Sequence, residues 1–171
     1  KMRIYETSGK QVREVPIPAM GNASSMVGEW DKDEAFYSFS SYKQPATIYR
    51  YQISTGKQEE WARIKVPVNT EQIEVKQVWY ESKDKTKVPM YIAYKKGIKL
   101  DGSNPTYMTA YGGFNSSLTP GFSTFAAYWI EQGGVYAVPN LRGGGEYGEE
   151  WHRAGMLHKK QNVFDDFIAA A

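Results

Sequence analysis

A four-residue turn sequence occurs twice in the first part of the chain. Residues 8–11 are Ser-Gly-Lys-Gln and residues 55–58 are Thr-Gly-Lys-Gln, which places the two glycines 47 positions apart. Each copy lies between two runs of alternating aromatic, β-branched and polar residues, the pattern of a β-hairpin. A hairpin unit that recurs about every 40 to 50 residues is typical of the blades of a β-propeller. The repeat therefore favours a propeller for this part of the chain.

The pattern changes near residue 68, and this change divides the chain into two predicted domains, 1–68 and 69–171. In the second domain, longer strands are expected over 73–82 and 87–96, joined by a short charged turn.

Strands and helices are predicted to alternate in the rest of the second domain. Apolar runs over 106–111 and 135–140 indicate strands, and residues 121–134 between them have the apolar spacing of a helix that ends at two glycines. Residues 141–160 are expected to form a long glycine-rich loop, and a second helix begins at Asn162. Strands connected through helices predict an α/β domain with a parallel sheet.

The composition excludes several classes of function. The chain contains no cysteine, so it has no disulfide, no thiol nucleophile and no Cys-ligated metal. Lys and Arg are scattered and the net charge is only +2, which argues against a nucleic-acid partner. No apolar run is long enough to span a bilayer, so no membrane partner is expected. His152 and His158 lack the spacing of metal ligands, and no metal or other cofactor is predicted.

Both ends of the sequence suggest an internal segment of a longer protein. Lys1 precedes Met2 and the strand pattern starts at once, whereas the last residues stop within a predicted helix. The N-terminal residues have no signal-peptide pattern, and the lack of cysteine fits the cytoplasm and the periplasm equally well.

Tyr111 stands at the end of a predicted strand and is followed by two glycines. In an open α/β sheet, ligands bind beyond the carboxyl ends of the strands. A phenol at this place could donate a hydrogen bond to an oxyanion, because its pKa of about 10 keeps the proton on at neutral pH. The same residues also fit a turn with a packed tyrosine ring, and taken alone they favour this structural role.

The run from Arg142 to Gly148 contains three consecutive glycines, but it has neither the P-loop lysine nor the G-x-G-x-x-G spacing. We interpret the glycines as a sharp backbone turn beside a neighbouring strand. An ion pair between Arg142 and Glu146, with a structural role, is expected.

Asp165 and Asp166 lie near the start of the second predicted helix, with Asn162 as its expected N-cap. We interpret these two acids as helix-capping rather than catalytic residues, and both histidines as structural. The expected buried face of this helix consists of Val163, Phe164, Phe167 and Ile168.

Three stretches together resemble the prolyl oligopeptidase family of serine peptidases. They are AYGGFNSSLTPGF over 110–122, GGVYAVPNLRGGGEYGEEWHRAGMLHKKQNVFDDF over 133–167 and SKDKTKVPMYIAYKKGIKLDGSNPTY over 82–107. Their order and spacing together are highly specific, and the blade-like repeats fit the end of the family's propeller. The resemblance implies the first part of an α/β-hydrolase domain, preceded by the last blades of a β-propeller.

The resemblance also implies an activity, the cleavage of short peptides after proline by acyl-enzyme chemistry. In the family, the tyrosine of the Tyr-Gly-Gly-Phe motif donates to the oxyanion, and the phenylalanine helps to line the proline pocket. These positions are Tyr111 and Phe114 in this chain, so the resemblance reverses the structural interpretation of Tyr111. No serine of the chain lies in a G-x-S-x-G elbow. The catalytic serine, acid and histidine are therefore expected outside these 171 residues, and the segment alone is expected to be inactive.

Two alternatives remain open. Oligopeptidase B shares the two-domain plan and the Arg-Gly-Gly-Gly-Glu run but cuts after basic residues. It usually has Met after that glutamate, Trp-Tyr in place of Trp-His and no phenylalanine in the Tyr-Gly-Gly motif, so Tyr147, His152 and Phe114 favour the proline-specific branch. The second alternative is a non-catalytic fragment that only binds peptides or another chain.

Overall fold

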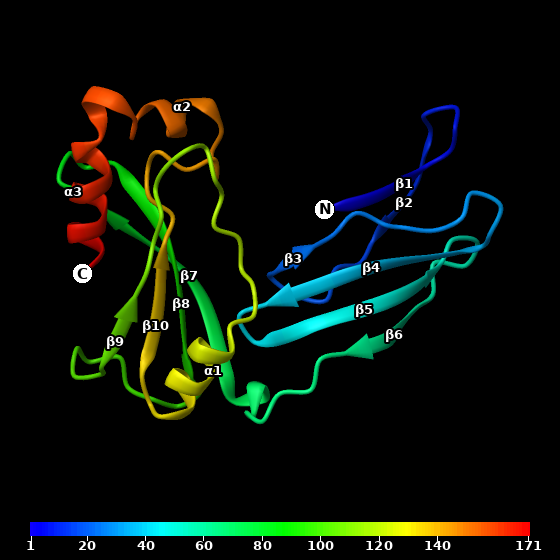
Figure 1. Cartoon of the computed structure of the whole chain (residues 1–171), viewed down its shortest axis with the longest axis horizontal. Coiled ribbons are helices and arrows are strands. Elements are labelled where there is room, and N and C mark those ends of the chain that lie inside the picture. The colour runs from blue at the N-terminus through cyan, green and yellow to red at the C-terminus, as the bar shows by residue number, and fades with distance from the viewer. The chain divides into compact units, whose positions relative to one another are not determined.

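The computed structural model describes all of residues 1–171 and contains two compact units. Unit 1 consists of Lys1–Pro67 together with Pro120–Ser123, and unit 2 consists of Val68–Thr119 and Thr124–Ala171. Each unit has its own β-structure (Figure 1).

Unit 1 is built from antiparallel strands in two sheets. The two-stranded sheet contains β1 (Met2–Tyr5) and β2 (Gln11–Val15), and the four-stranded sheet contains, in spatial order, β3 (Asn22–Ala23), β4 (Glu34–Ser41), β5 (Gln44–Gln52) and β6 (Gln58–Arg63). The sequence pattern does not predict β3, because a strand of two residues shows no alternation.

The repeated turn sequence joins β1 to β2 and β5 to β6. Gly9 has a φ of 87° and Gly56 a φ of 77°, in the left-handed region that residues with a Cβ rarely adopt. The hairpin β1–β2 therefore corresponds to the hairpin β5–β6 one repeat later, as the 47-residue spacing predicts.

The two sheets of unit 1 share one core. Val15 from β2 is buried with Tyr37 and Phe39 from β4 and Tyr51 from β5. Tyr37 stacks on Tyr49 with ring centroids 5.2 Å apart, and burial raises the pKa of Tyr37 to about 12. Both sheets thus bury one face in a common, largely aromatic core.

Unit 2 contains a four-stranded sheet with the spatial order β7–β8–β10–β9. Its strands are β7 (Ile73–Glu81), β8 (Lys87–Lys95), β9 (Thr106–Met108) and β10 (Val135–Pro139), and its helices are α1 (Thr124–Glu131), α2 (Glu149–Arg153) and α3 (Gln161–Ala170). Short 3-10 turns over Thr70–Gln72 and Leu157–Lys159 precede β7 and α3. Helix α1 packs on β8 and β10, and α3 packs on β7.

The sheet of unit 2 is mixed rather than parallel. Strands β9 and β10 are parallel, whereas β8 runs antiparallel to both β7 and β10. The parallel arrangement predicted for strands connected through a helix is confirmed for β9 and β10. Strands β7 and β8 are antiparallel because a turn this short can join only antiparallel strands. In that turn the Ser82 N–H donates to Thr86 O at 2.8 Å, and Lys85 has a φ of 68°.

The segment predicted as a glycine-rich loop, 141–160, contains helix α2. This helix follows Gly148 and has two glutamates in its first turn and His152 and Arg153 in its last. That order of charges complements the helix dipole, but five residues are too few to show a helical period in the sequence.

The carboxyl ends of β9 and β10 lie at the same edge of the sheet, because these strands are parallel. Figure 1 shows α2 and the beginning of α3 at this edge. The loop over 109–119, called the Tyr111 loop below, follows β9, and the loop over 140–148 follows β10.

A buried arginine connects three parts of unit 2. Arg142 has a side chain only 5% exposed, and it donates to Asp166 of α3 from Nε to Oδ2 at 3.0 Å and from Nη2 to Oδ1 at 2.6 Å. Its Nη1 donates to Asp84 Oδ2 at 2.6 Å, in the turn between β7 and β8. Asp166 is fully buried and also accepts the backbone N–H of Arg142 at 3.1 Å. The arginine therefore ties α3 and the β7–β8 turn to the loop after β10.

This network corrects three predictions about the start of α3. Arg142 pairs with Asp166 and not with Glu146, and Asp166 is a buried ion-pair partner rather than a capping residue. Asn162 is not the N-cap, because α3 already begins at Gln161; the Asn162 Nδ2 instead donates to a backbone carbonyl of the preceding segment, Ala154 O, at 2.9 Å.

The buried face of α3 also differs from the expected one. Only Val163 of the four predicted apolar residues is buried, whereas Phe164 is 53% and Ile168 70% exposed and Phe167 is also exposed. The ion pair explains this orientation, because Asp166 lies three positions after Val163 and so shares its side of the helix.

Asp166→Asn is expected to destabilise α3 strongly. The substitution leaves the buried Arg142 without its main charge partner, which commonly costs about 3–5 kcal/mol. Hydrogen exchange of the α3 amides measures the loss, as a fall in protection. Asp165→Asn is the matched control, because Asp165 bonds to Gln161 on the same helix. Equal exchange in the two variants would contradict this role of the ion pair.

The stabilising effect of Asp84 is expected to depend on pH. Its hydrogen bond from Arg142 lowers the pKa of Asp84 from 3.8 to about 2. Because the pKa is lowered in the folded state, the contribution to stability is complete above about pH 4 and is lost as the pH falls towards about 2. Urea unfolding at pH 7 and pH 2.5 should therefore show a larger difference between wild type and Asp84→Asn at pH 7. A difference independent of pH would exclude this coupling.

Candidate functional site

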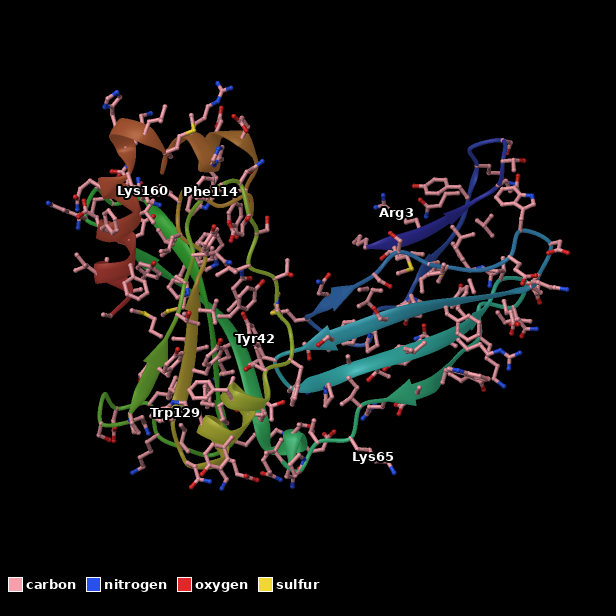
Figure 2. The ribbon with its side chains drawn as sticks, viewed as in Figure 1. Arg3, Tyr42, Lys65, Phe114, Trp129 and Lys160 are labelled. Atoms are coloured by element: carbon pink, nitrogen blue, oxygen red, sulfur yellow. The ribbon has the colours of Figure 1, made fainter.

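The Tyr111 loop carries both residues that the sequence singles out. Tyr111 is 53% exposed, and its hydroxyl has no hydrogen-bond partner within the chain. Phe114, labelled in Figure 2, is 88% exposed. Its ring centroid lies 6.5 Å from that of Tyr111. The structure thus places a free phenol and an apolar ring together, beyond the carboxyl end of β9.

The backbone of this loop turns sharply. Gly112, Phe114 and Asn115 have φ values of 61°, 51° and 56°, which is uncommon for residues other than glycine. Gly112 is required for a second reason, because a Cβ there would lie 2.5 Å from Val163 Cγ1. A Cβ at Gly113 would meet nothing closer than 3.8 Å, so only the first of the two glycines is imposed by packing.

Three consecutive glycines after β10, Gly143–Gly145, lie directly against the Tyr111 loop. Their Cβ atoms would stand 2.8 Å from Gly112 O, 2.9 Å from Ser116 O and 2.9 Å from Ser117 Oγ, respectively. Backbone hydrogen bonds join the two segments, from Asn115 N to Gly143 O and from Gly145 N to Ser116 O, each at 3.2 Å. The three glycines therefore allow the two backbones to approach closely. The sharp turn predicted for them is found only at Gly143, which has a φ of 90°.

Two polar side chains hold the far end of the Tyr111 loop. Glu146 Oε1 accepts the backbone N–H of Leu118 at 2.9 Å and the side-chain amide of Asn140 at 3.1 Å. Asn140 Nδ2 also donates to Leu118 O at 2.9 Å. Neither role is predicted from the sequence. The available signal was their position directly after β10, at the edge of the sheet where the Tyr111 loop begins.

His152 of α2 contacts the same region. Its Nδ1 lies 2.8 Å from Gly143 O and 3.2 Å from Asn115 N, and Gly143 O also accepts the Asn115 N–H at 3.2 Å. His152 thus has the structural contact expected of it. His158 is exposed and contributes nothing to this site.

The phenol of Tyr147, next to Glu146, is kept in its neutral form. Burial raises the pKa of Tyr147, and the negative charge of Glu146 raises it further. Its ring packs edge-on against Trp151, with centroids 5.2 Å apart.

No group of three or more His, Asp or Glu side chains is arranged to hold a metal ion. None of the helices is long and apolar enough to cross a membrane. The chemistry that the loop itself offers is a hydrogen bond from the Tyr111 hydroxyl, on a backbone fixed by close contacts, to an oxygen atom that carries negative charge.

Comparison with known proteins places these features in a class. Residues 1–63 match the N-terminal β-propeller domain of prolyl oligopeptidases, and residues 120–171 match the prolyl oligopeptidase family. The chain is therefore the first part of an α/β-hydrolase domain preceded by blades of a β-propeller. It belongs to the prolyl oligopeptidase family.

Individual relatives agree over nearly the whole chain. Prolyl endopeptidase of Elizabethkingia meningoseptica is 51% identical over 99% of this chain, and that of Dictyostelium discoideum is 44% identical over 99%. The chain spans about a quarter of the length of these relatives, 24% and 23% respectively.

Solved structures give the same result. A prolyl endopeptidase from a study of inter-domain dynamics matches with a TM-score of 0.89 and 52% identity over 98% of this chain and 25% of its own. Prolyl oligopeptidase B of Galerina marginata, bound to a 35mer hydrolysis and macrocyclization substrate, matches with a TM-score of 0.88 and 39% identity over 97% of this chain and 24% of its own.

Gly145→Ala is expected to destabilise the protein by about 1–3 kcal/mol, because the added methyl group overpacks the contact with the Tyr111 loop. The matched control is Gly113→Ala, since the space beside Gly113 is open and neither glycine has a positive φ. Urea unfolding compares the two variants. Equal losses would show that the triple-glycine segment is not needed for close contact.

Proposed function

We propose that the full-length protein carrying this chain is a serine peptidase that cleaves short peptides after proline. The observation that carries this proposal is the Tyr111 hydroxyl, which is exposed and unpaired on a loop with a fixed backbone. Membership of the prolyl oligopeptidase family supports it, as do the prolyl endopeptidases among the relatives.

In the proposed mechanism, Tyr111 stabilises the tetrahedral intermediate. A serine attacks the carbonyl carbon of the proline residue and passes its proton to a histidine, and the carbonyl oxygen becomes an oxyanion. The Tyr111 O–H donates to this oxyanion together with a backbone N–H. The histidine then protonates the leaving amine, and water hydrolyses the acyl-enzyme. We place the serine, the acid and the histidine outside these 171 residues.

Phe114 is proposed to line the pocket for the proline side chain. A phenylalanine that is 88% exposed has most of its apolar surface available to a ligand, and the burial of such a ring is worth about 1.5–3 kcal/mol. Its position on the same loop as the oxyanion donor would couple recognition of the proline ring to the reacting carbonyl.

We further propose residues 1–68 as the end of the propeller domain and residues 69–171 as the beginning of the catalytic domain. Peptides are the proposed partners. Solved structures of a relative, prolyl oligopeptidase B of Galerina marginata, have 25mer and 35mer substrates bound. An oligopeptidase B-like specificity for basic residues is not favoured, because two relatives that are 51% identical to this chain are prolyl endopeptidases.

Tyr111→Phe in the full-length protein is expected to lower kcat by about 100- to 1,000-fold, with little change in KM. The substitution removes one oxyanion donor, worth about 2.7–4 kcal/mol in the transition state. Hydrolysis of a Gly-Pro chromogenic amide measures it, with an Arg-Arg amide to test specificity. Tyr107→Phe is the control, because Tyr107 lies on β9 just before the loop.

Three outcomes decide the proposal. Cleavage after proline that depends on the Tyr111 hydroxyl supports it. Cleavage after arginine alone would favour dibasic specificity. Activity on neither substrate would favour a protein that binds peptides without cleaving them.

A further inference from the structure

The charged side chain of Lys160 bonds to the Tyr111 loop at the residue that follows Tyr111. Its Nζ donates to Gly112 O at 2.7 Å. Lys160 is half-buried and immediately precedes α3, and Figure 2 shows it at the same end of unit 2 as Phe114. The contact spans 48 residues of sequence, so it joins two segments that no local pattern relates.

The position of Lys160 is itself fixed. Its Nζ lies 5.9 Å from the ring centroid of Phe164, one turn further along α3, in a cation–π arrangement. Val163 of the same helix packs beneath Gly112. Two residues at the start of α3 thus hold Gly112: Val163 by an apolar contact and Lys160 by a charged donor at the carbonyl. The Arg142–Asp166 pair anchors this helix.

The hydrogen bond from Lys160 to Gly112 O affects the orientation of the neighbouring Tyr111 side chain. Gly112 O belongs to the peptide group that follows Gly112, and the preceding peptide group connects Gly112 to Tyr111. With a φ of 61°, Gly112 has the backbone freedom of glycine. A charge-assisted hydrogen bond is about twice as strong as a neutral one, so it can select one of the conformations open to this residue.

We propose that Lys160 is a positioning residue that orients the Tyr111 hydroxyl for the transition state by holding the carbonyl of Gly112. This inference rests on the proposed function of Tyr111 as the oxyanion donor. Lys160 does not touch the substrate and acts only through the loop. Because the oxyanion exists only in the transition state, loss of this contact affects kcat and leaves KM nearly unchanged.

The test uses the full-length protein and a Gly-Pro chromogenic amide. Lys160→Met keeps most of the side-chain stem and removes the charged donor, and it is expected to lower kcat by about 10- to 100-fold, the scale of a small misplacement of a catalytic group. Lys159→Met is the matched control, because Lys159 is exposed and its side chain makes no hydrogen bond or ion pair. Lys160→Arg, which keeps a charged donor, is expected to restore part of kcat.

A double-mutant cycle with Tyr111→Phe separates positioning from general stability. If Lys160 acts through Tyr111, Lys160→Met lowers kcat by less than about threefold once the hydroxyl is gone, since the two effects are not additive. A purely structural role would give the same loss in both backgrounds. Should Lys160→Met fail to fold, Lys160→Gln, which is shorter and uncharged, runs the same cycle.

The failures of the two proposals are distinguishable. If Tyr111→Phe lowers kcat but Lys160→Met behaves like Lys159→Met, the role of Lys160 is wrong and the proposed function stands. Additive losses in the cycle overturn the positioning role in the same way. If Tyr111→Phe has no effect on kcat while the protein still cleaves after proline, the donor role of Tyr111 and the positioning role of Lys160 are both wrong. If no cleavage after proline occurs, the proposed function itself is wrong.

Discussion

The buried pair of Arg142 and Asp166 is the interaction on which the rest of unit 2 depends. Asp166 is fully buried and the Arg142 side chain is 5% exposed, so neither can keep its place without the other. A buried ion pair is often no more stabilising than apolar residues of the same volume. Its contribution here is geometric, because the planar guanidinium also reaches Asp84 and so fixes α3 relative to both the β7–β8 turn and the loop after β10.

Close contact between two backbones is the second constraint. The Tyr111 loop and the triple-glycine segment lie so near each other that side chains are excluded from one of them. This contact leaves few conformations to the residues after Tyr111, and Phe114 and Asn115 adopt left-handed conformations that cost of order 1–3 kcal/mol each. Such strain persists only where the surroundings impose it, and here hydrogen bonds to Gly143, Gly145, and Glu146 impose it.

The sequence predicted the elements of this fold better than their relations. Alternation and glycine turns are local signals, so they predict the hairpins and the helix before β10. The motif with Tyr111 and Phe114 identifies the candidate site. Asp166 was misread because an acid near a helix start has the same local pattern whether it caps the helix or pairs with an arginine 24 positions earlier. The need for three glycines could not be predicted either, because the loop that they contact lies nearly thirty residues away in sequence.

The most direct test of the account is a crystal structure of the full-length protein with a peptide aldehyde that ends in proline. Addition of a serine to the aldehyde creates an oxygen that stands in for the oxyanion. The account predicts that the Tyr111 hydroxyl lies about 2.7–3.1 Å from this oxygen, with Gly112 O still bonded to Lys160. An inhibitor oxygen bound by other donors, with the Tyr111 hydroxyl turned away from it, would contradict the account.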